Sequence, residues 1–508
     1  MSSAAWRVVG ITTLYIILFL LAAYPLVIVN HPPLQDYANH LARMYVLQNN
    51  DNIFLNRYYQ VEWHLIPNLL MDLIIPTLNK VLTLQYAGKA YILLVFFLLT
   101  SGSVFLHWVL YRKLSLIPLF SFLLIYNMAL QKGFLSFLGG CGLAIWALAI
   151  WLWLRDRNPV LRVLIGTLMS GLLYIAHLHV FGVYAIVVVV YEIASIDWRA
   201  RRAWKDKLAD TVLALLQFTP WVLLFLFIVV PSSGGDGYWS YGNYDRILRK
   251  VQIGWVISPS YQPVLDWFGS VLLVAGIALA FGRRWLRLHP KIAWGLLVLI
   301  ALVFALPGAM LGGANGDWRL LIPVVFITSG AVRLDDARSK SPGETMIAIG
   351  ILLFMVLLRI TFVGSQWKIA DKFYSDFVKV VQVCETGSRL FTAANDIIYA
   401  SPDQAQSRFT IMHLPTFGVI ERQLFVPTLA AYPMQQPISY RPNMRSVRQQ
   451  AGYNIFFYRS DAKLPCEFVQ HEFDYLLLID EEDSSDSKAC GLQRVSKSGV
   501  LTLYKVQK

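Results

Sequence analysis

Charged residues are scarce in this chain. They make up 15% of its 508 residues, whereas soluble domains contain about 25%. Hydrophobic residues make up 56%, and the mean hydropathy is +0.52. This composition excludes a soluble enzyme, a fibrous protein and a disordered chain. The four cysteines are too few for a disulfide scaffold.

The sequence signatures of nucleotide-driven and soluble metal-dependent enzymes are also absent. The chain contains no GxxxxGK[ST], HExxH, CxxC or GxSxG motif, and no GxGxxG that opens a helix after a strand. The sequence therefore predicts no nucleotide-hydrolysing domain. Any group that this protein transfers would have to come from a donor that is already activated.

Long apolar runs recur along the first 363 residues, and each is long enough to predict a membrane span. The first run, at about 8–29, is longer than the apolar core of a cleavable signal and lacks its cleavage site, so we expect a retained span. The fold class that follows is an α-helical polytopic membrane protein with about 11 transmembrane helices. The other runs cover roughly 88–110, 114–129, 133–154, 160–176, 180–195, 209–230, 266–282, 292–310, 318–333 and 344–363.

The net charge of +13 lies almost entirely in this hydrophobic part, because the 16 basic and 15 acidic residues from 364 onward nearly cancel. Threading the chain alternately through the membrane places Arg7 and five basic loop clusters on one side, which the positive-inside rule makes cytoplasmic. The charge therefore reports topology, with the N-terminus inside and the C-terminus outside, and not a nucleic-acid partner. The clusters are Arg112/Lys113, Arg155/Arg157/Arg162, Arg199/Arg201/Arg202/Lys205/Lys207, Arg283/Arg284/Arg287/Lys291 and Arg333/Arg338/Lys340.

One apolar segment, 61–80, does not fit this scheme as a span. Counting it would reverse the side of all five clusters, and Asp72 and two prolines fit poorly in a lipid-facing helix. We therefore expect an interfacial or re-entrant helix on the outer face. The transmembrane domain, 1–363, then carries an outer loop at 30–87 that contains this helix, and a second outer loop at 231–265.

Residues 364–508 have the composition of a soluble domain. Runs typical of β-strands alternate there with mixed polar stretches, which predicts a small α/β domain outside the membrane. A disulfide can survive in that compartment, and the spacing of Cys466 and Cys490 leaves open whether they form one. The strand-like runs lie at 389–393, 475–479 and 500–506.

The densest group of polar residues is HPPLQDYANHLAR, at 31–43, directly after the first span. Its two prolines end the helix, and Asp36 can cap a new one that runs through His40 and Arg43. Capping alone would explain Asp36. A carboxylate beside histidines, an asparagine and an arginine at the bilayer rim can also act as a general base or a metal ligand.

At these residues the sequence resembles the GT-C superfamily of integral membrane glycosyltransferases. Members use polyprenyl-phosphate sugars and place a catalytic acidic residue in the first outer loop, where Asp36 matches. The stretch 131–157 is similar to the GFxxFxxG pattern of bacterial members, and the whole predicted architecture matches. The resemblance implies that Asp36 is catalytic and that the donor is a polyprenyl-phosphate-linked sugar. It leaves open whether a divalent cation takes part.

In such a reaction, cations on the outer face can stabilise the charge of the leaving lipid phosphate. The candidate substrate-binding residues lie near Asp36, at the outer ends of spans, or on the 231–265 loop, whose aromatic side chains could stack on a sugar. They are His40, Arg43, Glu62, His64, Lys132, His177, His179, Tyr238, Trp239, Arg246, Arg249 and Arg319.

These candidates have ordinary structural alternatives. Lys132 can snorkel to lipid headgroups, and Arg319 can pair with Asp317. His177 and His179 can form hydrogen bonds between helices. The basic residues of the 231–265 loop, including Lys250, can contact anionic lipids, and its aromatic residues can form an interfacial belt.

The predicted function is transfer of a hexose or pentose to an envelope glycan, lipid or protein acceptor on the outer face of a bacterial inner membrane. One alternative is a transporter or flippase of a lipid-linked saccharide. Transporters usually show internal repeats and ionisable residues near the midplane, and the sequence shows neither. A second alternative is a non-catalytic scaffold for envelope assembly, which would make Asp36 dispensable.

Overall fold

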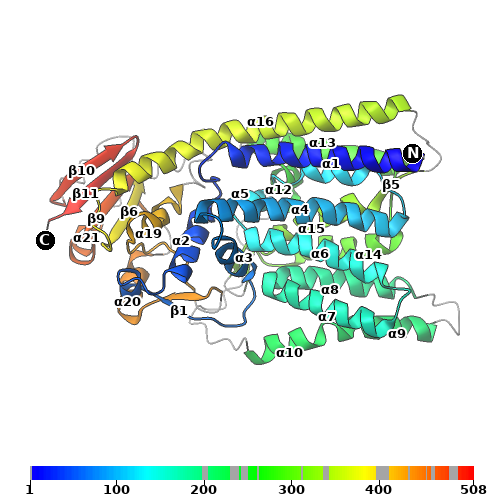
Figure 1. Cartoon of the computed structure of the whole chain (residues 1–508), viewed down its shortest axis with the longest axis horizontal. Coiled ribbons are helices and arrows are strands. Elements are labelled where there is room, and N and C mark those ends of the chain that lie inside the picture. Colours follow the sequence, from blue (N-terminus) through cyan, green and yellow to red (C-terminus); the bar gives the residue numbers. More distant parts are fainter. Residues whose placement is uncertain are drawn as a thin grey trace.

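The computed structural model shows an elongated molecule in which a bundle of roughly parallel helices carries a small strand-containing domain at one end (Figure 1). The N-terminus lies at the other end of the bundle. The structure describes residues 3–196, 204–228, 240–241, 250–259, 263–310, 313–335, 342–395, 411–432, 435–452, 455–458, 464–479 and 490–507.

Most of the predicted apolar runs are regular helices, which confirms a multi-pass membrane protein. Within the described ranges, six helices are long and apolar enough to cross a bilayer, or seven if the bent pair α9 and α10 forms one span, and four further apolar helical segments are shorter. The number of about 11 spans stays a prediction. The helices are α1 (Ser3–Val27), α4 (Leu84–Tyr111), α6 (Leu135–Trp153), α7 (Pro159–Ala176), α8 (Leu178–Ile193), α9 (Trp204–Leu216), α10 (Thr219–Ile228), α12 (Ile253–Ile257), α13 (Pro263–Gly282), α14 (Pro290–Ala305), α15 (Leu321–Ala331) and α16 (Pro342–Val381).

The run at 114–129 differs from the expected regular helix. It forms a 3₁₀ helix, η2 (Ile117–Leu123), and then the short helix α5 (Met128–Gln131). Asn127 starts α5 by accepting a hydrogen bond from the backbone N–H of Leu130 at 3.0 Å. A 3₁₀ segment rises about 2.0 Å per residue, so it covers more distance per residue than an α-helix. Apolar content alone does not distinguish the two.

Helix α16 runs across the domain boundary at 363/364, which stays a prediction. It continues without a break to Val381 and has 40 residues, which corresponds to about 60 Å, or twice the hydrocarbon thickness of a bilayer. Composition changes near 364 because the helix becomes polar and not because it ends. Its second half carries the C-terminal domain away from the bundle (Figure 1).

Described members of the basic clusters meet at the end of the bundle near the N-terminus. Arg155 and Arg162 both bind Glu192, at 2.9 and 2.7 Å. Strand β2 (Leu286–Leu288) pairs with β5 (Val332–Leu334) and places Arg287 opposite Arg333. Their common end agrees with the predicted single-sided placement; which side of the membrane it faces stays a prediction.

At the opposite end, the segment 61–80 contains only a nine-residue helix, α3 (Leu70–Leu78). At 1.5 Å per residue it is about 14 Å long, too short to cross a bilayer. This agrees with the predicted non-spanning helix. Helix α2 (Tyr37–Gln48), the 3₁₀ turn η1 (Leu55–Arg57) and strand β1 (Tyr59–Val61) precede it in the first outer loop.

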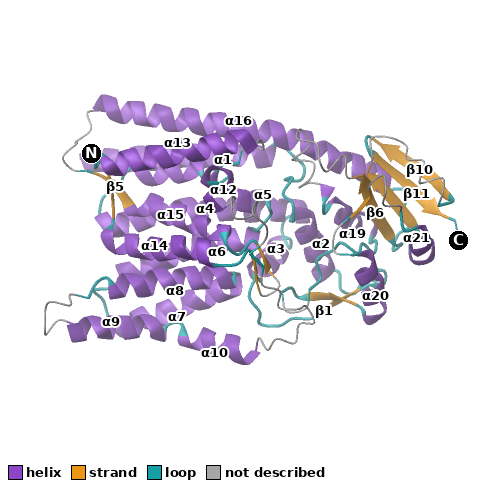
Figure 2. Cartoon of the chain, turned by 180° about the vertical axis from the view of Figure 1, so that it is seen from behind, coloured by secondary structure: helices purple, strands orange, loops and turns teal. Residues whose placement is uncertain are grey.

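The C-terminal domain has a five-stranded sheet in the order β10-β11-β9-β6-β8, flanked by short helices (Figure 2). The three predicted strands are confirmed, whereas β10 was not expected because its residues are mostly polar and exposed at the sheet edge. Strand β6 runs parallel to β8 and β9, and β11 is antiparallel to β9 and β10. The elements are β6 (Leu390–Asn395), α19 (Phe417–Arg422), β7 (Ile438–Tyr440), α20 (Pro442–Ala451), β8 (Phe456–Tyr458), α21 (Cys466–Glu472), β9 (Tyr475–Ile479), β10 (Leu492–Ser498) and β11 (Leu501–Val506).

Three features tie this domain together and to the first outer loop. Cys466 and Cys490 form a disulfide, with a Cα–Cα distance of 5.2 Å. Strand β1 pairs antiparallel with β7, so that Tyr59 lies opposite Tyr440. In addition, the backbone N–H of Ala430 donates to the side chain of Asn39 in α2 at 2.9 Å. The outer loop and the C-terminal domain therefore form one structure over the end of the bundle.

Candidate active site

Asp36 lies in the turn that leads from the first span into α2. Its backbone N–H donates to the carbonyl oxygen of Lys132 at 3.3 Å, and the N–H of Gln35 donates to that of Gln131 at 2.9 Å. These bonds hold the first outer loop against the turn between α5 and α6. Asp36 occupies the N-cap position of α2, but its side chain makes no capping hydrogen bond. Capping therefore does not account for this carboxylate.

Gly133 allows the close approach of these two turns. Its φ is +77°, and a Cβ atom at this position would lie 2.8 Å from the backbone nitrogen of Asp36. Any larger residue would be strained and would push the loops apart. The carbonyl oxygen of Gly133 also lies 2.9 Å from Nε2 of His40. The glycine thus sets the distance between Asp36 and its neighbours.

His413 reaches this turn from the C-terminal domain, immediately before η5 (Leu414–Thr416). Its Nε2 lies 3.4 Å from Oδ1 of Asp36, and the two side chains are 11% and 27% exposed. The neighbouring Met412 accepts a hydrogen bond from the Gln35 amide at 3.0 Å. His413 thus covers one side of Asp36 and leaves part of the carboxylate open to a ligand.

The electrostatic surroundings keep Asp36 ionised. Burial raises the pKa of its carboxyl, but the hydrogen bond and charge of His413 and the charge of Lys132 outweigh burial and place that pKa below its ordinary value. Burial and the charge of Arg43 lower the pKa of His40 to about 4. At neutral pH His40 is therefore a neutral imidazole whose Nε2–H donates to Gly133.

Two predicted cations, Lys132 and Arg319, lie beside this carboxylate. Nζ of Lys132 donates to the side chain of Gln35 at 3.0 Å. The guanidinium carbon of Arg319 lies 3.5 Å from the ring centroid of Phe134, the residue after Gly133. The charge of Asp36 acts on Arg319, and among described residues the Nε of Arg319 has no hydrogen-bond partner. Both cations are placed where an anionic group next to Asp36 could bind.

Asp317, a predicted partner of Arg319, forms its ion pair with Lys250. The Nζ–Oδ2 distance is 3.4 Å, and the side chains are 3% and 0% exposed. Lys250 also donates to the carbonyl oxygen of Leu306 at 2.9 Å. The expected contact of Lys250 with lipid headgroups is therefore wrong, because this lysine is buried and neutralises a buried aspartate.

His177 and His179 hold the turn between α7 and α8. Nε2 of His179 lies 3.1 Å from the carbonyl oxygen of Gly316. Nδ1 of His177 accepts a hydrogen bond from the N–H of His179 at 3.2 Å. These contacts correspond to the structural alternative, since they tie the α7–α8 turn to the turn that bears Arg319. A direct contact of either histidine with substrate stays a prediction.

Three other candidates make contacts with residues other than Asp36 or are exposed to solvent. Arg43 donates to Asp72 at 2.6 and 3.2 Å and is fully buried, so it joins α2 to α3. Its predicted substrate contact stays a prediction. Glu62 accepts hydrogen bonds from Gln60 and Ser439. His64 is exposed. The candidates Tyr238, Trp239, Arg246 and Arg249 lie outside the described residues.

The possible metal ligands at this site are few. Among the residues that the structure describes, no three His, Cys, Asp or Glu side chains are grouped to hold an ion. Two side chains of ligand type, Asp36 and His413, lie 3.4 Å apart near the cations. Participation of a divalent cation stays a prediction.

Sequence reasoning missed His413 because no local signal marks it. It lies 377 residues after Asp36, in an apolar stretch of a domain that looked separate from the membrane part. Its proximity follows from the pairing of β1 with β7 and from the packing of η5 on α2. Only the tertiary structure brings these segments together.

Comparison with solved structures identifies the architecture. ArnT from Cupriavidus metallidurans in the apo state superposes with a TM-score of 0.52 at 13% identity, and the match covers 100% of this chain and 99% of ArnT. The same protein bound to undecaprenyl phosphate gives a TM-score of 0.53 at 11% identity with the same coverage. No protein-family model matches the sequence, and no curated protein matches it significantly. Over its whole length the chain therefore has the fold of ArnT.

Proposed function

We propose that this protein is a GT-C-type glycosyltransferase that moves a sugar from a polyprenyl-phosphate donor to an envelope glycan, lipid or protein. The observation that carries the proposal is Asp36, an ionised carboxylate that makes no capping bond, is partly open, and lies beside Lys132 and Arg319. The ArnT fold supports it, because ArnT has been solved with undecaprenyl phosphate bound.

The arrangement suits a displacement at the anomeric carbon. An acceptor hydroxyl is a weak nucleophile at neutral pH, so Asp36 takes its proton as the new C–O bond forms. The bond between the anomeric carbon and the phosphate oxygen breaks, and the leaving phosphate keeps the electron pair. Lys132 and Arg319 stabilise the charge that develops there.

The same proposal places the site at the outer face of a bacterial inner membrane. The described members of the five basic loop clusters lie at the opposite end of the bundle from Asp36, and basic loops face the cytoplasm. The disulfide between Cys466 and Cys490 supports an oxidising compartment for the C-terminal domain. Together these features favour a periplasmic domain.

Mass spectrometry of envelope glycans tests the proposal. Deleting the gene should remove a sugar from one glycan, lipid or protein, and the wild-type chain should restore it. Asp36→Asn should not restore it at equal protein level. Asp51→Asn, which changes an exposed acid of the same outer loop, is the matched control. Restoration by Asp36→Asn would support the scaffold or transporter alternative.

A further inference from the structure

His177 lies in the turn where helices α7 and α8 meet, and its ring is held by the backbone of that turn. Its Nδ1 accepts a hydrogen bond from the N–H of His179 at 3.2 Å. Nε2 of His179 contacts the carbonyl oxygen of Gly316 at 3.1 Å, which ties this turn to the one that bears Arg319. The side chain of His177 is partly exposed. The ring is therefore fixed in orientation but not fully enclosed.

The hydrogen of this imidazole is on Nε2. Burial and the charge of Arg319 hold the pKa of His177 well below its ordinary value, so the ring is neutral at pH 7. A neutral imidazole has one N–H, and Nδ1 already acts as an acceptor. Nε2 is therefore a donor, and it forms no hydrogen bond with any residue that the structure describes. The protein thus orients an N–H group that it does not use internally.

His177 and Arg319 contact the same aromatic ring. The imidazole meets Phe137 edge to face, with the ring centroids 5.4 Å apart, and the guanidinium carbon of Arg319 lies 5.9 Å from the Phe137 centroid. Asp317, two residues before Arg319, is engaged in its ion pair with a lysine. A neutral N–H donor and a guanidinium therefore share one aromatic support beside the site of Asp36.

We propose that His177 is a third phosphate-binding residue, which donates its Nε2–H to the phosphate of the polyprenyl-phosphate donor beside Arg319. The inference rests on the proposed function and adds a residue to its donor site. Phosphate oxygens accept several hydrogen bonds at once, and their charge strengthens each of them. A neutral imidazole suits this position, because it donates without adding a charge that would repel the guanidinium. His179 has no such role, because its Nε2 is engaged with Gly316.

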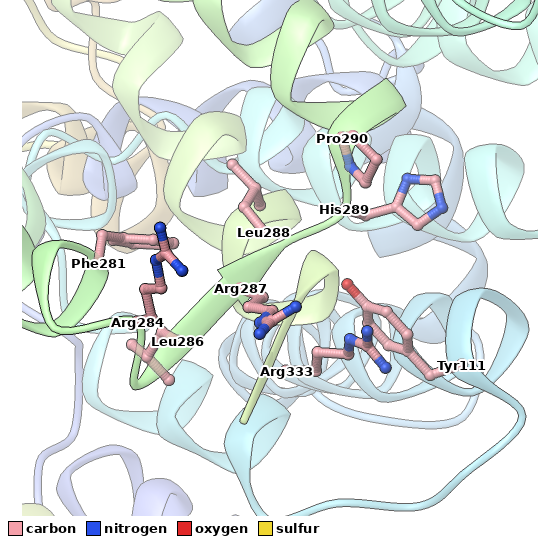
Figure 3. A pocket seen from close by; sticks show the side chains of 9 residues that line it. All are labelled: Tyr111, Phe281, Arg284, Leu286, Arg287, Leu288, His289, Pro290 and Arg333. Carbon is pink, nitrogen blue, oxygen red and sulfur yellow. The ribbon is translucent and has the colours of Figure 1, made fainter. Parts of the chain in front are cut away.

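Binding of farnesyl phosphate to the purified full-length chain tests this assignment. Farnesol, which lacks the phosphate, is the second probe. His177→Ala should raise the Kd for farnesyl phosphate about tenfold, the usual cost of losing a hydrogen bond to a charged group, and should leave farnesol binding unchanged. His177→Gln, which keeps an N–H donor at about the position of Nε2, should recover most of the affinity. These variants leave the arginine-lined pocket at the other end of the bundle unchanged (Figure 3), so a difference in binding reports the site beside Asp36.

Three further variants complete the test. His177→Phe keeps the aromatic contact with Phe137 but has no N–H, so it should bind farnesyl phosphate as weakly as His177→Ala. His471→Ala removes a histidine of α21 that is 84% exposed and should leave both affinities unchanged. If His177→Ala binds like the wild type while Arg319→Ala binds weakly, the donor site stands and the assignment of His177 is wrong. If neither variant weakens binding, the proposed donor site fails with it. An equal loss of farnesyl phosphate and farnesol binding, or no recovery in His177→Gln, would also overturn the assignment.

Discussion

Asp36 is held by two parts of the chain that are distant from it in sequence. The backbone of Lys132 fixes its main chain, Gly133 allows the close approach, and His413 contacts its carboxylate. None of these contacts uses the carboxylate to cap α2. The side chain is therefore oriented by the site and not by the helix that follows it.

Asp36→Asn should lower the rate of sugar transfer by about two orders of magnitude or more, the usual cost of losing a general base. An amide of the same size cannot take a proton at neutral pH. Because no capping bond is lost, the unfolding temperature in detergent should stay unchanged for both Asp36→Asn and Asp36→Ala. A fully active, well-expressed Asp36→Asn protein would show that Asp36 is not the general base.

The pH profile separates Asp36 from its neighbour His413 as the base. The pKa of Asp36 is lowered from 3.8, so the active ionised form is complete above that value and is lost only as the pH falls through the lowered pKa. We expect kcat/KM to show no acid limb between pH 8 and about 5. A fall of kcat/KM as the pH decreases through neutrality would instead indicate an imidazole base. His413→Gln should then cost as much activity as Asp36→Asn.

At the scale of elements, two short turns place the cations. The α5–α6 turn carries Lys132, and the turn before α15 carries Arg319, whose guanidinium packs on Phe134 of the first turn. The α7–α8 turn supports the turn before α15, because Nε2 of His179 contacts the carbonyl oxygen of Gly316. Three outer turns thus form one surface next to Asp36.

Lys132→Ala and Arg319→Ala should each raise the KM for the polyprenyl-phosphate donor by about tenfold, because each removes a charge-assisted contact to phosphate. Donor titrations with purified protein measure this. Lys80→Ala, which removes an exposed cation from the same outer loop, should have no effect. If the KM for the donor is unchanged in both site variants, Lys132 and Arg319 do not bind the donor phosphate and have only structural or lipid contacts.

The buried pair of Arg43 and Asp72 joins α2 to α3. Asp72→Ala should destabilise the protein by about 3–5 kcal/mol, since it leaves a guanidinium buried without its partner. The double variant Arg43→Met/Asp72→Leu should be more stable than Asp72→Ala alone, because both charges are removed. Thermal unfolding in detergent compares them. If Asp72→Ala unfolds like the wild type, the pair does not hold α3 in place.

At the scale of the whole molecule, topology and fold are linked. An odd number of spans puts the C-terminal domain on the side of Asp36, where His413 and strand β7 meet the first outer loop. A protein with its C-terminus on the other side could not form these contacts. The site can therefore form only if the number of membrane spans is odd.

A reporter that is active only outside the cytoplasm should be active when fused after Lys508. The same reporter fused after Arg112, at the other end of α4, should be silent, because the positive-inside rule places this end in the cytoplasm. Reporters of the opposite type should give the reverse result. If both patterns are inverted, the span count is wrong by one.

The sequence by itself determined the features that depend on composition and local pattern. Apolar runs must lie in lipid with their backbone bonds satisfied inside a helix, so the succession of spans could be predicted. The basic loops predicted one common end, the prolines and polar residues at 31–43 marked the first outer loop, and the apolar strands at 475–479 and 500–506 marked the C-terminal sheet. The resemblance to the GT-C superfamily rested on these features, and the structure has the fold of ArnT over its whole length.

Only the tertiary structure decided which side chains meet. Arg43 pairs with Asp72 and Lys250 with Asp317 because burial makes an unpaired charge costly, and the partner is chosen by packing. His413 reaches Asp36 across 377 residues because β1 pairs with β7. Hydropathy and motif spacing report only neighbours along the chain, whereas the site and the opposed Arg287 and Arg333 are set by strand register and by turns that approach one another in space.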